Sequence, residues 1–122
     1  MRSLITVFVV DALTKVFPTC LPPSVPVTEL RVTCARNEYE SAQIAFRLSE
    51  AKEVTLSIGP IKHESGYVLP AERQRWNFVG TVPLKHNTPC PDPKRLVCRA
   101  PCEVPDPLLA ERKLLVPPKR TQ

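Results

Sequence analysis

Apolar and polar residues alternate with a period of two along several short segments of this chain, and this pattern most restricts its fold. Successive side chains of a β-strand point to opposite faces, so such alternation is typical of half-buried antiparallel strands. The alternating segments are residues 27–35, 42–48, 54–58 and 75–84. Residues 4–10 are apolar or β-branched throughout, which is typical of a strand covered on both faces. Since long amphipathic helices are absent from the pattern, we predict an all-β, β-sandwich-like fold of about five or six antiparallel strands.

Proline is the main departure from ordinary globular composition, with 15 Pro and only three Gly in 122 residues. This is about 12% Pro, against a usual ~5%. Nine of the prolines lie in residues 83–122, which we predict to be a Pro-rich, irregular part of one domain spanning residues 1–122. Proline cannot donate a ladder hydrogen bond, so this part should lie at a sheet edge or cross between sheets. Residues 108–116 are expected to add one more strand, or a helical turn around residues 110–112.

The apolar faces of the predicted strands indicate the core. Leu30, Val32 and Cys34 share one face of their segment, so the Cys34 thiol is expected to pack as a small hydrophobe. Trp76 is the expected core anchor because of its large apolar area. A compact chain of this length buries roughly 65% of its unfolded surface, which is enough for a real core.

Charge and hydropathy argue against two classes of partner. The net charge is +5, and residues 83–122 carry eight Lys or Arg against four Asp or Glu. A nucleic-acid site would interleave such a basic stripe with aromatics, which these residues lack, so no nucleic-acid partner is predicted. No apolar run approaches the ~18 residues of a membrane span, so no membrane partner is predicted. The run at 4–10 is short for a signal peptide, and Asp11 follows it without a small-residue cleavage site.

Residues 35–43 place two carboxylates and a Gln at the start of a predicted strand. Glu38 and Glu40 at i and i+2 of a strand would share one face at ~6.5 Å, a spacing that glycoside hydrolysis permits. Many strands carry such pairs, so we favour a structural role. Glu38 would accept backbone N–H groups at the strand bend, and Glu40 or Gln43 would satisfy a neighbouring loop. The chain has no nucleophile elbow and no phosphate-binding glycine pattern, so no catalytic residue and no cofactor is predicted.

The five cysteines are an odd number, which argues against a fully paired disulfide framework. His86, Cys90, Cys98 and Cys102 are the candidates for a metal site. Structural zinc sites favour a tight C-x2-C spacing, which this chain lacks, so no metal is predicted. One loop disulfide, Cys90–Cys98 or Cys98–Cys102, is an alternative to reduced thiols throughout.

A carbohydrate-binding surface needs exposed aromatic rings that stack on sugars. Tyr39 and Tyr67 are the candidates for sugar contact, because Trp76 is expected in the core. Two isolated aromatics make a weak signal, and a carbohydrate-binding module is the first alternative function.

Five motifs form an ordered series along the chain. They are residues 9–18 (VVDALTKVFP), 35–43 (ARNEYESAQ), 76–80 (WNFVG), 100–101 (AP) and 105–109 (PDPLL). This series resembles the N-terminal β-sandwich of bacterial glycoside-hydrolase-like proteins related to N-acetyl-β-galactosaminidases. The motifs are moderately specific as a series and weak singly, and the resemblance spans nearly the whole chain.

The resemblance implies that a TIM-barrel domain follows and carries the catalytic acids, a neighbouring Asp–Glu pair that uses the substrate acetamido group. No segment here supplies a barrel, so no catalytic residue is carried over. The motif positions that match the sandwich are expected to be structural. They are Asn37, Glu38, Glu40, Gln43, Trp76 and Asp106.

We therefore expect a non-catalytic accessory domain that buttresses a catalytic barrel, in a chain truncated before that barrel. The compartment stays undecided; a secreted or periplasmic parent fits the resemblance. An incomplete sandwich would leave open strand edges, which favour self-association. The second alternative function is a small interaction protein stabilised by a metal or a disulfide.

Overall fold

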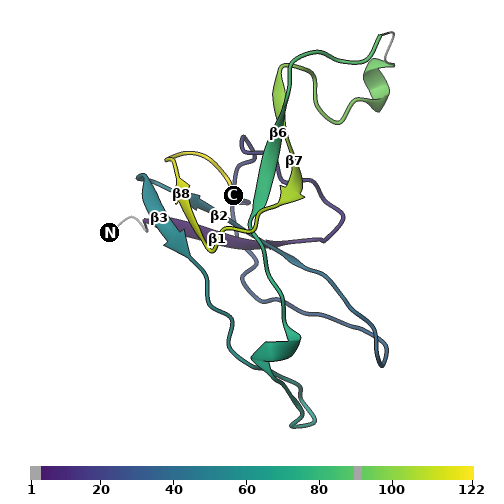
Figure 1. The fold of residues 1–122 in the computed structure, drawn as a ribbon, viewed down its shortest axis with the longest axis vertical. Helices are drawn as coiled ribbons and strands as arrows, with labels where there is room; N and C mark the ends of the chain where they lie inside the picture. The colour runs from purple at the N-terminus through teal and green to yellow at the C-terminus, as the bar shows by residue number, and fades with distance from the viewer. Residues whose placement is uncertain (1–3, 90–91) are drawn as a thin grey trace.

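The computed structural model describes residues 4–89 and 92–122, and within them the fold is all-β (Figure 1). Two short 3-10 turns, η1 (Ala71–Arg73) and η2 (Pro93–Arg95), are the helical elements of this described part. The strands are β1 (Ile5–Val10), β2 (Gln43–Leu48), β3 (Lys52–Thr55), β4 (Ile61–Lys62), β5 (Val68–Leu69), β6 (Val79–Leu84), β7 (Cys102–Leu108) and β8 (Lys113–Val116).

The strands pair as four two-stranded antiparallel ladders, β1–β2, β3–β8, β4–β5 and β6–β7. The prediction of an all-β, antiparallel, sandwich-like fold is confirmed. The predicted strand number is wrong, because the described residues form eight strands, several of them only two to four residues long. Among the described residues the ladders stay two-stranded and do not close into a barrel, although β2 also forms a bridge between Arg47 and Thr121 on its second edge.

Buried side chains lie on both faces of the β1–β2 ladder. Val7 pairs with Phe46, and Phe8 pairs with Ala45. Because cross-strand pairs share a face and neighbouring residues alternate, Phe46 is buried on one face, while Phe8 and Ala45 are buried on the other. This matches the prediction for residues 4–10, although Ile5 at the start of β1 is 41% exposed.

The main core gathers residues from three ladders. Phe46 and Leu48 of β2, Phe78 just before β6, and Val116 of β8 form one buried cluster. Trp76 lies half-buried at its rim, with its ring edge-to-face against Phe78 at 5.3 Å between centroids. The prediction of Trp76 as core anchor is therefore wrong, since Phe78 occupies that position.

Residues 27–35 do not form the predicted strand. Leu30 is 39% and Val32 45% exposed, and Cys34 is exposed as well, so its thiol is not a core group. The segment meets the free edge of β1 through the N–H of Val9, which donates to the carbonyl of Val27 at 2.7 Å. Alternation alone therefore did not produce a strand, because a strand also requires a partner edge along its length.

The Pro-rich third is more regular than predicted, since it contains β7 in addition to β8, which lies within the strand expected at residues 108–116. β7 includes Pro105 and Pro107, which a two-stranded ladder tolerates because each strand keeps one free edge. Opposite them, a register shift interrupts β6 at Gly80. A Cβ on Gly80 would come within 2.7 Å of the Leu109 side chain, so the missing side chain lets β7 pack closely. β6 begins at Val79, four residues later than the predicted start at 75.

The chain exposes far more surface than a compact protein of its mass. Its accessible surface is 10162 Å² at 13.7 kDa. A compact monomer of this mass would expose roughly 6,600 Å², and its unfolded chain about 20,000 Å². Folding thus removes only about half of the unfolded surface, less than expected from chain length. The β6–β7 ladder and the β4–β5 hairpin extend away from the core in opposite directions (Figure 1).

Candidate functional site

The segment 35–42 forms an exposed turn rather than a strand start. Asn37 adopts a left-handed backbone with φ of 63°, which Asn tolerates better than most residues. The Glu38 carboxylate accepts a hydrogen bond from the N–H of Ala35 at 2.6 Å, and the Glu38 N–H donates back to the Ala35 carbonyl at 3.3 Å. Glu38 thus stabilises a local turn, as its structural interpretation expected.

Gln43 links the first residue of β2 to a neighbouring loop. Its Nε2 donates to the carbonyl oxygens of Asp11 and Thr14, each at 2.7 Å. On the other side of the same loop, Lys15 lies 3.8 Å from the Asp106 carboxylate of β7 and donates to the Pro105 carbonyl at 3.3 Å. The loop after β1 is therefore held between β2 and β7 by two residues of the motif series.

Glu40 does not form a strand-face pair with Glu38, because residues 35–42 contain no strand in the described structure. Glu40 is exposed and lines a shallow hollow of about 420 Å³ between the end of β1 and residues 30–33. The same-face geometry that would favour a catalytic pair of carboxylates is thus not formed.

Trp76 and Arg112 form a contact at the rim of the core. The Arg112 guanidinium lies 4.6 Å from the centre of the Trp76 ring, and its Nη1 donates to the Trp76 carbonyl. A cation over an indole face is favourable and occupies the ring surface that a sugar would need.

Tyr39 and Tyr67 are highly exposed, at 87% and 60%. They belong to different loops, the turn at 35–42 and the tight β4–β5 connection, and the tips of these loops lie apart in Figure 1. Each ring is therefore presented by its own loop.

The candidate metal ligands are not gathered into one centre within the part of the chain that the structure describes. His86 is exposed, and Cys90 lies outside the residues that the structure describes. Among those residues, no group of three or more His, Cys, Asp or Glu side chains is arranged to hold a metal ion.

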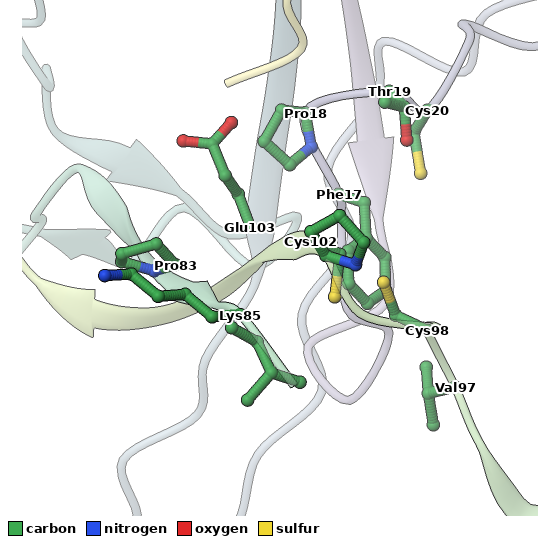
Figure 2. Close-up of a pocket in the computed structure, with 12 residues that line it drawn as sticks. Phe17, Pro18, Thr19, Cys20, Pro83, Lys85, Val97, Cys98, Cys102 and Glu103 are labelled. Carbon is green, nitrogen blue, oxygen red and sulfur yellow. The ribbon is translucent and has the colours of Figure 1, made fainter. Parts of the chain in front are cut away.

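Two of the cysteines do lie together, in an open depression of about 620 Å³ beside the end of β6. We name it the thiol-lined depression; its lining includes Phe17, Pro18, Cys20, Leu84, Val97, Cys98 and Cys102. Cys98 and Cys102 have neighbouring sulfurs, whereas the sulfur of Cys20 lies apart from them (Figure 2). The side-chain hydrogen bond with Cys98, then desolvation and the charge of Cys98, raise the pKa of Cys102 to about 11.

The last residues of the chain form contacts that the sequence patterns did not indicate. The N–H of Phe46 donates to the Gln122 carbonyl at 2.8 Å, and the N–H of Gln122 returns a bond to Phe46 at 2.9 Å. Thr121 is 2% exposed, and its hydroxyl accepts from Arg47 Nη1 at 3.0 Å. Residues 121–122 thus lie beside β2 opposite β1, a long-range pairing that no local periodicity encodes.

No protein-family model matches this sequence, and a search of curated proteins finds no relative. The resemblance to glycoside-hydrolase-like sandwich domains therefore stays a prediction. The described part of the chain also contains no helix with the length and apolar character that crossing a membrane requires.

Proposed function

We propose that this chain is a non-catalytic accessory domain that docks on a larger catalytic domain of a glycoside-hydrolase-like protein. The observation that carries the proposal is its surface area. It exceeds that of a compact monomer by roughly 3,500 Å², more than the ~1,000–2,500 Å² that each partner buries in an obligate interface. Docking would remove surface that this fold leaves in water.

The exposed surface is rich in apolar side chains. Nineteen large hydrophobic residues of the described chain are exposed, against six that form its buried core. Leu108 of β7 is 69% and Leu115 of β8 is 70% exposed. Burying apolar surface contributes roughly 25 cal/mol per Å², so these residues would supply the main driving force for docking. The free strand edges offer backbone groups to the same partner, or to a second copy.

The contacts that the polar motif residues make support an accessory role for the chain. Glu38 binds a backbone N–H, Gln43 holds the loop after β1, and Asp106 pairs with Lys15 of that loop. These groups stabilise loops, which agrees with the structural role expected of the motif positions. The proposed partner is therefore the barrel that carries the catalytic acids in such proteins.

Enzyme assays with aryl N-acetyl-β-galactosaminides test this proposal. The isolated chain is expected to show no turnover. Added to an N-acetyl-β-galactosaminidase barrel that lacks its own sandwich, the chain is expected to raise the barrel's Tm in a saturable manner. The matched control is the double variant Leu108→Ser and Leu115→Ser, which should stabilise the barrel less. Turnover by the isolated chain, or a barrel unaffected at any concentration, would contradict the proposal.

A further inference from the structure

The thiol-lined depression contains a pair of cysteines that the proposed function does not use. Cys98 lies in the loop before β7, and Cys102 is the first residue of β7. Both side chains enter the depression, and their sulfurs are neighbours in Figure 2. The Ala100 N–H between them donates to the Asn87 side chain at 3.0 Å, which fixes the connecting loop.

The proximity of the two sulfurs is the observation that matters here. Cys98 and Cys102 line the same depression with their sulfurs side by side, and both are free thiols (Figure 2). Both residues are half-buried, which leaves a path for a small reagent. Residues joined by a disulfide have Cβ atoms about 3.5–4.5 Å apart, and two side chains with neighbouring sulfurs in one open depression are placed to reach this separation.

We propose that Cys98 and Cys102 form a reversible dithiol–disulfide pair that reacts with low-molecular-weight disulfides. In the first step the Cys98 thiolate attacks one sulfur of the external disulfide, forms a mixed disulfide and releases one thiolate. The Cys102 sulfur, on losing its proton, then attacks Cys98 Sγ and releases the second. The two protein thiols are oxidised, the external disulfide is reduced to two thiols, and the two protons pass to the released thiolates.

The position of the pair gives this chemistry a structural consequence. Oxidation would join the loop 98–102 into a closed ring at the start of β7. The neighbouring residue, Glu103, binds Arg120 near the end of the chain. The Phe17 and Pro18 side chains from the loop after β1 line the same depression. The disulfide would therefore rigidify the end of the β6–β7 ladder that points away from the core, where the loop after β1 lies beside it.

The test is a redox titration of the full chain in buffers of reduced and oxidised glutathione, followed by alkylation and peptide mass spectrometry. We expect one two-electron transition and a peptide in which Cys98 is linked to Cys102, with the chain lighter by two hydrogen atoms. Cys34→Ser, which removes an exposed thiol outside the depression, should leave this transition unchanged. Cys98→Ser and Cys102→Ser should each abolish it and accumulate a glutathione adduct on the remaining cysteine.

Three results would overturn the proposal. They are a linked peptide that joins Cys98 or Cys102 to Cys20 or Cys90 instead, independent adducts on both thiols of the native chain, and alkylation that stays complete at every redox ratio. The titration of the native chain decides the question even if a serine variant fails to fold.

Discussion

The guanidinium of Arg120 binds the carboxylate of Glu103 through two hydrogen bonds, at 2.5 and 3.1 Å. The same guanidinium donates to the Thr81 hydroxyl at 3.1 Å. Arg120 thereby ties the final segment of the chain to both strands of the β6–β7 ladder. Bidentate Arg–carboxylate pairs restrict geometry more than single contacts do. This pair therefore fixes the orientation of the final segment relative to the β6–β7 ladder.

Removing the Glu103 charge should make stability less dependent on pH. The hydrogen bond from Arg120 lowers the pKa of Glu103. A lowered folded-state pKa stabilises the fold above the ordinary carboxyl pKa of ~4.3, and that stabilisation is lost as pH falls through the lower folded value. Glu103→Gln should lower the free energy of unfolding at neutral pH by about 1 kcal/mol or less, because the pair is partly exposed. Urea unfolding between neutral and acidic pH measures both effects.

Glu53→Gln is the matched control, since Glu53 lies 3.6 Å from Lys113 in an exposed single contact. We expect a smaller change from this variant. Equal losses of unfolding free energy from Glu103→Gln and Glu53→Gln would show that the Arg120 contact contributes no more stability than an exposed single ion pair.

Gln43→Ala should release the loop after β1. The variant leaves the carbonyls of Asp11 and Thr14 without their hydrogen bonds from Gln43. At about 0.5–1.5 kcal/mol for each net hydrogen bond, the two bonds together predict a loss of about 1–3 kcal/mol. Amide hydrogen exchange should rise in residues 11–15 above all. Glu40→Gln, in the same stretch, should change neither quantity; faster exchange spread evenly over the chain would argue against a local role for Gln43.

Phe78→Ala should destabilise the fold more than Trp76→Ala. Phe78 is 6% exposed within the core, and truncating such a residue usually costs about 3–5 kcal/mol. Trp76 lies at the rim, so its truncation removes less buried area. Thermal unfolding of the two variants compares them directly. A larger loss from Trp76→Ala would restore the role that the sequence pattern suggested for that residue.

Neither exposed tyrosine is expected to bind a sugar alone. Tyr39 and Tyr67 lie on separate loops, so a ligand ring would stack on one aromatic at most. Calorimetric titration of the chain with N-acetylgalactosamine should give no saturable heat. Saturable binding that Tyr39→Ala or Tyr67→Ala abolishes would instead support a carbohydrate-binding module.

Local patterns predicted those strands that find a partner strand along their whole length. Residues 4–10 and 42–48 gave β1 and β2, and residues 108–116 gave β8. The equally clear alternation at 27–35 failed, because the free edge of β1 takes only a short contact from it. β7 was missed because Pro105 and Pro107 oppose a strand assignment unless a bulged partner such as β6 is known.

The candidate site residues also divide into those whose partners are local in sequence and those whose partners come from distant segments. The turn role of Glu38 and the loop role of Gln43 follow from local chemistry, since Glu and Gln side chains at a bend satisfy nearby backbone groups. The sequence left two pairings open, Cys90–Cys98 and Cys98–Cys102, and the folded loop places Cys98 and Cys102 in one depression, while Cys90 lies outside the described residues. The Arg120–Glu103 contact joins residues 17 apart through a chain reversal, and no local spacing encodes it.

The central claim is that this fold leaves in water a surface shaped for a partner. The slope of unfolding free energy against urea concentration tests it most directly, because this slope scales with the surface that unfolding exposes. With 10162 Å² already exposed when folded, the slope should lie about a quarter below that of a compact domain of the same length. A slope equal to that of a compact domain would contradict the claim.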